Sequence, residues 1–115
     1  MRKLAVLSTL TFSFCATSTA QAKTEHNWWN LVTRCESIGQ RDPWYTNTGN
    51  GYYFGPQFDR GTWHRNGGGP VREMGDAYGK PMHWYSISYI MRIAENTLRA
   101  QGPYAWPNCW RYIYG

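Results

Sequence analysis

Two cysteines that lie toward opposite ends of the chain, Cys35 and Cys109, constrain its fold more than any other feature. The third cysteine, Cys15, lies in an apolar N-terminal segment that we expect to be removed on export. An even pair of cysteines in an exported chain is typical of a disulfide, which here would tie an early helix to the C-terminal segment. Two free thiols, or half of a zinc site, are the alternatives. A zinc site is disfavoured because the three histidines are scattered and show no ligand spacing.

The N-terminal segment has the pattern of a secretory signal peptide. Two cations are followed by an apolar run, and small residues close the segment at Ala20 and Ala22. The apolar run is too short to remain as a membrane-spanning helix. We therefore predict a signal peptide over residues 1–22, a single secreted domain over residues 23–115, and no stable membrane insertion. Loss of the two leader cations lowers the formal net charge from +5 by two, and the remaining cations are dispersed, which argues against nucleic-acid binding.

The first half of the domain shows a helical pattern and then a turn-rich pattern. Hydrophobic periodicity predicts a helix over residues 27–36, with Asn27 as its N-cap and Gly39 as its stop. In residues 43–55, aromatic and polar residues alternate around the turn-forming residues 47–51, which predicts a short β-hairpin. The hairpin would follow the first helix and could fold back over its end.

Two further helices are predicted in the second half of the chain. Asp59 is placed to cap a short helix that runs through Arg65 and that the glycines at 67–69 terminate. A longer helix ends at Gly102-Pro103, and its apolar residues recur at steps of three and four. Its predicted buried stripe consists of Trp84, Ile87, Met91, Ala94 and Leu98. The predicted fold is therefore mostly helical, with one small hairpin.

Glu36 differs from the other acidic residues because aromatic side chains are near it in the sequence, at Trp28, Trp29 and Trp44. Burial beside aromatic rings disfavours a carboxylate and raises its pKa, which an acid needs if it is to donate a proton near neutral pH. Cleavage of a glycosidic bond suits such an acid, and exposed tryptophan and tyrosine rings can stack on sugars. A solvated glutamate at a helix end is the alternative. Asp59 is better explained by its capping role.

Four segments resemble the catalytic domain of the resuscitation-promoting factors of actinobacteria, small secreted proteins with a lysozyme-like fold that cut peptidoglycan. The segments occur in the family's order and include both cysteines. They are WWNLVTRCES (28–37), NTGNGYY (47–53), GPQFDRGTW (55–63) and RAQGPYAWPNC (99–109). The resemblance implies a small lysozyme-like fold of the α+β class, mainly α, with a short β-hairpin and a Cys35–Cys109 disulfide.

The resemblance also implies which residues act on the substrate. Glu36 would be the catalytic acid, and seven further residues would bind substrate: Trp44, Asn50, Tyr52, Gln57, Asp59, Thr62 and Gln101. The expected substrate is the peptidoglycan glycan strand, cut at the β-1,4 bond after N-acetylmuramic acid. The product would be a reducing sugar if the enzyme is a hydrolase, or a 1,6-anhydro sugar if it is a lytic transglycosylase. We expect a monomer at the cell wall, with no metal or cofactor. A partner peptidoglycan endopeptidase is implied for some members.

Some residues near the predicted site depart from the family pattern. Ile38 replaces a glycine after the acid, Pro43 stiffens a longer loop, and Pro103 stands where a tryptophan is usual. The alternative function is therefore a non-catalytic wall-binding or signalling module, in which aromatic residues hold glycan and Glu36 is an ordinary residue. Loss of activity in Glu36→Gln with binding retained would separate the two.

Overall fold

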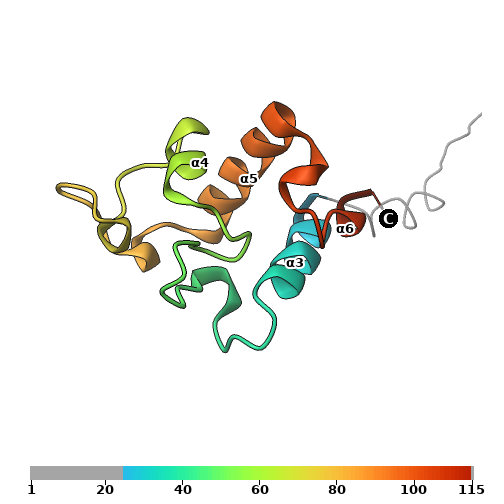
Figure 1. The fold of residues 1–115 in the computed structure, drawn as a ribbon, viewed down its shortest axis with the longest axis horizontal. Helices are drawn as coiled ribbons and strands as arrows, with labels where there is room; N and C mark the ends of the chain where they lie inside the picture. The colour runs from blue at the N-terminus through green and yellow to red at the C-terminus, as the bar shows by residue number, and fades with distance from the viewer. Residues whose placement is uncertain (1–24, 115) are drawn as a thin grey trace, which may run out of the picture.

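The computed structural model describes residues 25–114, with side chains described from Trp28 to Ile113. Four α-helices and four short 3-10 turns make up most of this part of the chain (Figure 1). The α-helices are α3 (Glu25–Glu36), α4 (Arg60–Arg65), α5 (Ile87–Gln101) and α6 (Arg111–Tyr114). The 3-10 turns are η1 (Pro43–Tyr45), η2 (Arg72–Met74), η3 (Met82–Trp84) and η4 (Pro103–Ala105). The predicted signal peptide lies outside the described residues.

The predicted fold class, mainly α with a small β contribution and one disulfide, is confirmed. A disulfide joins Cys35 to Cys109 with a Cα–Cα distance of 5.9 Å, and α3 packs beside α6 as a result (Figure 1). The β structure consists of isolated bridges in the described residues, including the antiparallel pair Asn47–Tyr53 across the predicted hairpin turn. Full strands do not form there because the first arm begins with the η1 turn, where Pro43 favours a helical start.

The first helix begins earlier than the sequence pattern predicts. It starts at Glu25, so that Asn27 lies inside the helix and is not its N-cap. The helix ends at Glu36, and Gly39 adopts a left-handed φ of +82° in the turn that follows. Burial of Trp29 against the core stabilises the helix more than its local capping signal does.

The long helix buries part of the predicted stripe. Ala94 is buried, and Met91 and Leu98 pack against the core. Ser86 caps its N-terminus by accepting a hydrogen bond of 3.1 Å from the backbone N–H of Tyr89, so the helix starts at Ile87. Trp84 therefore lies in the η3 turn, and 62% of its surface is exposed. The buried residues of α5 are Ile90, Ile93, Ala94 and Thr97. The prediction that Trp84 and Ile87 are buried is wrong, because Trp84 lies outside the helix and Ile87 is exposed at its first residue.

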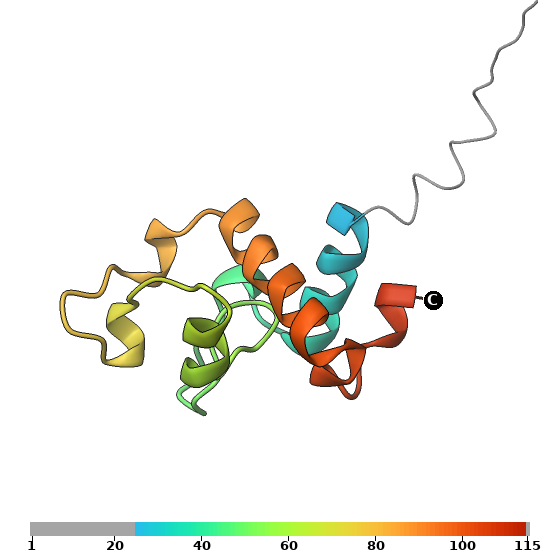
Figure 2. The same cartoon turned by 90° about the horizontal axis from the view of Figure 1, so that it is seen from above.

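Aromatic rings form much of the core. Trp63 of α4 stacks on Phe54 with ring centroids 4.4 Å apart, and Trp29 of α3 meets Trp106 edge to face at 4.9 Å. Seen from above, α5 runs through the middle of the molecule, between α3 and the segment that joins α4 to α5 (Figure 2).

In the described part of the chain, no helix has the length and apolar character needed to cross a membrane.

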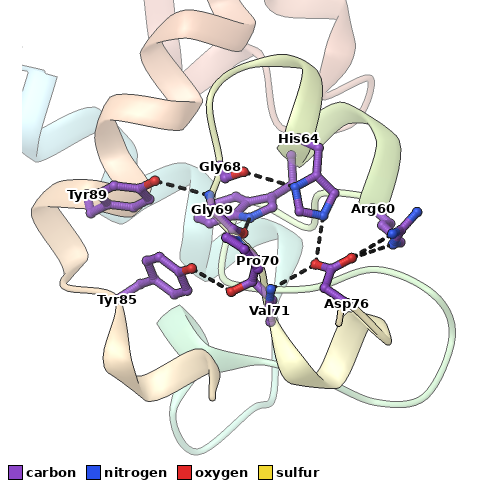
Figure 3. Close-up of polar contacts among 10 residues, drawn as sticks. Arg60, His64, Gly68, Gly69, Pro70, Val71, Asp76, Tyr85 and Tyr89 are labelled. Carbon is purple, nitrogen blue, oxygen red and sulfur yellow. Dashed lines mark hydrogen bonds and ion pairs between the residues drawn. The ribbon is translucent and has the colours of Figure 1, made fainter. Parts of the chain in front are cut away.

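A polar cluster around Asp76 holds the segment between α4 and α5 in place (Figure 3). The Asp76 carboxylate accepts hydrogen bonds from Arg60, from His64 at 2.7 Å and from the backbone N–H of Val71 at 2.8 Å. The other ring nitrogen of His64 lies 2.9 Å from the carbonyl oxygen of Gly68. The Asp76 side chain is only 7% exposed, so its charge is compensated almost entirely by these contacts.

Candidate active site

A cleft of about 470 Å³ opens beside the C-terminal end of α3. Its walls come from α3, the turn before α4, α4 itself, the end of α5 and the segment that begins with η4. The lining residues are Glu36, Tyr52, Pro56, Gln57, Phe58, Asp59, Thr62, Thr97, Gln101, Tyr104, Ala105, Trp106 and Pro107. The cleft therefore combines one half-buried acid with uncharged polar groups and aromatic rings.

Six of the sequence-predicted site residues meet in this cleft. They are Glu36, Tyr52, Gln57, Asp59, Thr62 and Gln101. They come from segments spread over most of the domain, and only the folded chain brings them together. Their roles toward a substrate remain predictions.

The other two predicted site residues, Trp44 and Asn50, do not line the cleft. Trp44 is 8% exposed and packs in the core, where its indole N–H donates a hydrogen bond of 3.1 Å to Asn30. Asn50 lies in the exposed turn, and its side-chain oxygen accepts a hydrogen bond of 3.1 Å from the backbone N–H of Tyr52. In the structure Trp44 contributes to the core and Asn50 stabilises the turn, and their roles toward a substrate also remain predictions.

Glu36 is held at the edge of the cleft by its two neighbours in the chain. Cys35 is bonded to Cys109, and the buried Ser37 hydroxyl donates a hydrogen bond of 2.9 Å to the carbonyl oxygen of Gly55. The first contact ties the helix end to the C-terminal segment, and the second ties it to the wall that carries Gln57. The backbone of Glu36 is thus anchored on both sides.

Burial raises the pKa of the Glu36 carboxyl above its ordinary value. Among the side chains from Trp28 to Ile113, none donates a hydrogen bond to this carboxyl and no cation pairs with it, so nothing among them offsets the cost of desolvation. The rings expected to bury it, Trp29 and Trp44, direct their N–H groups elsewhere, to Glu95 and Asn30. A neutral carboxyl facing a cleft can act as a proton donor.

The segment that carries Gln57 into the cleft lining has an unusual backbone. Phe54 and Gln57 both have positive φ angles, 66° and 62°, although neither is glycine. The Gln57 amide group donates a hydrogen bond of 3.0 Å to the carbonyl oxygen of Phe54, and Trp106 donates one of 2.9 Å to that of Pro56. Such strained positions persist where surrounding contacts hold them, and they cluster at functional sites.

Asp59 is the second carboxylate of the cleft, and it caps α4 as the sequence predicts. Its carboxylate accepts a hydrogen bond of 2.7 Å from the backbone N–H of Thr62. The Thr62 hydroxyl accepts a further hydrogen bond of 3.2 Å from Arg65. Asp59 is exposed and engaged in this cap, whereas Glu36 is half-buried and has no such partner.

Sequence reasoning missed several lining residues, of which Thr97 and Tyr104 are the clearest. Thr97 lies one helical turn before Gln101, so its place on the same face of α5 follows from the spacing. Tyr104 follows the Gly102-Pro103 helix stop, a signal that predicts a turn but not the direction of the next side chain.

In the described residues, no group of three His, Cys, Asp or Glu side chains is arranged to hold a metal ion.

Comparison with known proteins assigns this chain to a family. The sequence model of the transglycosylase-like domain family matches residues 22–109. The chain belongs to the transglycosylase-like domain family. Among similar proteins, resuscitation-promoting factor RpfE of Mycobacterium tuberculosis is 45% identical over 83 residues, covering 72% of this chain and 41% of RpfE. RpfD of the same species is 35% identical over 105 residues, covering 91% of this chain and 60% of RpfD.

A third relative of this transglycosylase-like domain comes from another genus. Resuscitation-promoting factor Rpf2 of Corynebacterium glutamicum is 42% identical over 81 residues, covering 70% of this chain and 19% of Rpf2. The resemblance to the catalytic domains of resuscitation-promoting factors is confirmed. The matched region spans less than two thirds of the length of each of these three relatives.

Proposed function

We propose that this chain is an exported enzyme that cuts the β-1,4 bond between N-acetylmuramic acid and N-acetylglucosamine in peptidoglycan, with Glu36 as its general acid. One observation carries the proposal most directly: Glu36 is a half-buried carboxyl with a raised pKa and no polar partner in the described residues, and it faces a cleft of about 470 Å³. Membership of the transglycosylase-like family supports glycan chemistry, and similarity to the resuscitation-promoting factors supports peptidoglycan as the substrate.

In the proposed reaction, the protonated Glu36 carboxyl donates its proton to the bridging oxygen of the glycosidic bond. The bond from that oxygen to C1 of the muramic acid breaks, and its electron pair leaves with the oxygen, which becomes the free 4-hydroxyl of N-acetylglucosamine. The Glu36 carboxylate then takes a proton from the nucleophile that attacks C1. Water as the nucleophile gives a reducing sugar, and the muramic acid's own C6 hydroxyl gives a 1,6-anhydro sugar.

A single-acid mechanism is favoured over a double-carboxylate one. Asp59 is the other carboxylate in the lining, and it is exposed and occupied by its helix cap. A second carboxylate would need to be free to approach C1 as a nucleophile, or to contact the attacking water as a base. Uncharged polar groups from Gln57, Thr62 and Gln101 can instead hydrogen-bond the sugar hydroxyl and acetamido groups.

Digestion of purified actinobacterial peptidoglycan tests the proposal, with soluble products resolved by mass spectrometry. The wild-type domain should release fragments, and Glu36→Gln should reduce the rate about a thousandfold, because general acid catalysis contributes at that level. Asp42→Asn is the matched control, because Asp42 is an exposed carboxylate outside the cleft lining, and it should retain most of the activity. Equal release by wild type and Glu36→Gln would remove Glu36 from the mechanism.

The same digestion separates the remaining alternatives. The mass of the muramic acid end distinguishes hydrolysis from anhydro-sugar formation. Binding of peptidoglycan by the wild type with no release of fragments would favour the non-catalytic binding module. Export, action as a monomer and assembly with a peptidoglycan endopeptidase remain predictions, and detection of the processed domain in culture medium would test the first of these.

A further inference from the structure

Tyr104 is an exposed aromatic residue that faces the cleft. It is 69% exposed and belongs to the η4 turn at the C-terminal side of α5. Seven large hydrophobic residues of the described chain are exposed, and of these only Tyr52 and Tyr104 line the cleft. Leaving an aromatic face in water forgoes the stabilisation that burial gives, so an exposed ring inside a cleft is a candidate for ligand contact.

The backbone on both sides of Tyr104 is fixed. Gly102 ends α5 with a φ of +78°, and Pro103 occupies the first position of the η4 turn. Two residues later, Trp106 is 3% exposed and donates its buried hydrogen bond to Pro56, and Cys109 carries the disulfide. A ring on such a segment loses little backbone freedom on binding.

The Tyr104 ring also has a partner that supports its orientation. It packs against Trp110 with ring centroids 5.4 Å apart and planes inclined at 60°. Within residues 25–114, the Tyr104 hydroxyl makes no hydrogen bond, and its pair with Trp110 leaves most of the side chain in solvent. Tyr104 can thus present a ring face to a ligand and still offer a hydroxyl at its edge.

We propose that Tyr104 is a stacking platform that binds one sugar ring of the glycan strand in the cleft. This inference rests on the proposed function, because it assigns the ligand as the same glycan. Pyranose rings have an apolar face of C–H groups that packs on aromatic rings, while their hydroxyls need the polar partners that Gln57, Thr62 and Gln101 supply on the other walls. Tyr52, which is 46% exposed, lines the cleft from a different segment, so the strand would meet an aromatic ring from each of two walls.

A binding experiment in a Glu36→Gln background tests the platform without any dependence on turnover. The probe is a tetrasaccharide of alternating N-acetylglucosamine and N-acetylmuramic acid, and its dissociation constant is measured by calorimetry. Adding Tyr104→Ala should weaken binding about fivefold, whereas Tyr104→Phe should bind as tightly as the parent, since the ring face is kept. Tyr78→Ala is the matched control: Tyr78 is 99% exposed and lies outside the cleft lining, so its removal should leave binding unchanged.

The outcomes separate this inference from the proposed function. Unchanged binding by Tyr104→Ala, with the parent binding the tetrasaccharide, would overturn the platform alone. Equal weakening by Tyr78→Ala would also overturn it, because the effect would then not be specific to the cleft. Failure of the parent to bind the tetrasaccharide would contradict glycan binding by the cleft, and with it both proposals.

Kinetics give a second, independent readout. In the active background, Tyr104→Ala should raise KM for the glycan about fivefold and leave kcat within about twofold, as expected when binding to substrate and transition state is lost equally. A fall in kcat at constant KM would overturn the platform, because it would place Tyr104 in the chemical step. The exposed position of Tyr104 predicts that Tyr104→Ala and Tyr104→Phe leave the thermal midpoint nearly unchanged relative to their parent.

Discussion

The hydroxyl of Ser37 donates a buried hydrogen bond of 2.9 Å to the carbonyl oxygen of Gly55, and so joins the residue after Glu36 to the facing wall of the cleft. The same two segments also meet at Thr33. A methyl group added at Gly55 would lie 2.4 Å from the Thr33 Cγ2 atom and 2.6 Å from its Oγ1 atom. The position of the acid relative to the wall therefore depends on a close backbone approach that only glycine permits.

Gly55→Ala should destabilise the domain and lower its activity. The buried Thr33 side chain cannot move away freely, so the added methyl should cost about 2 kcal/mol of unfolding free energy and displace Glu36 from the wall. Urea denaturation and peptidoglycan release measure the two effects.

A control and a rescue make the Gly55 test specific. At Gly61 an added methyl would approach the flexible end of Arg65 at 3.0 Å and make an ordinary contact of 3.6 Å with Asp59, so Gly61→Ala should be well tolerated. The Thr33 hydroxyl is buried and has no hydrogen-bond partner in the described part of the chain. Thr33→Ala removes the clashing group at little cost, so it should restore part of the stability that Gly55→Ala loses. A double variant no better than Gly55→Ala would contradict the clash.

The raised pKa of Glu36 predicts how activity depends on pH. Burial raises this pKa, and the acid must be protonated to donate, so kcat/KM should persist above the pH at which an ordinary glutamate ionises. It should then fall as the pH rises through the raised pKa. A pH profile measured on soluble glycan fragments checks this, and a rate that instead rises with pH across the same range would argue against an acid role.

The same pKa shift has a consequence for stability. A carboxyl whose pKa is raised on folding stabilises the protein below its unfolded pKa, and that contribution is lost as the pH rises through the folded pKa. Glu36→Gln cannot ionise, so its unfolding free energy relative to wild type should increase over that interval. Paired urea denaturation curves at several pH values measure the difference, and a difference independent of pH would be inconsistent with burial of the ionised form.

The disulfide should contribute strongly to stability because it closes a long loop. Cys35 and Cys109 are 74 positions apart, for which chain-entropy arguments give about 4 kcal/mol. Replacing both cysteines with serine should lower the free energy of unfolding by this amount, which appears as a lower urea midpoint. It should also reduce activity, since Cys35 precedes the acid. An unchanged midpoint after reduction of the wild-type protein would contradict this prediction.

Asp76 should contribute to stability in a way that disappears in acid. Desolvation acts to raise the Asp76 pKa, but the hydrogen bonds from Val71, Arg60 and His64, together with the charge of His64, lower it overall. A lowered pKa gives stability that is present above the unfolded pKa and lost as the pH falls through the folded pKa. Asp76→Asn should therefore cost about 2 kcal/mol at pH 7 and progressively less below about pH 4.

The chain contains a matched control for Asp76. Asp42 contacts His83 at 3.1 Å, but both side chains are more than half exposed. Exposed ion pairs contribute little, so Asp42→Asn should leave the urea midpoint nearly unchanged. Equal effects of the two substitutions would show that burial of the Asp76 cluster is not what makes it stabilising.

Local signals and cysteine number allowed much of this molecule to be predicted from its sequence alone. The Asp59 cap, the helix stops at Gly39 and Gly102 and the Cys35–Cys109 pair each depend on short-range chemistry or on the number of available thiols. The helix boundaries were not predicted to the residue: α3 starts two residues before its predicted cap.

Only the tertiary structure decided which aromatic residues build the core and which face the cleft. Trp44 is near Glu36 in the sequence yet is buried, whereas Tyr104 is distant in the sequence and lines the same cleft as the acid. Trp84 continues the helical spacing of α5 yet lies outside that helix. The physical reason is that burial depends on contacts between segments far apart in the chain, such as Trp106 with Pro56, and periodicity within one segment carries no information about such contacts.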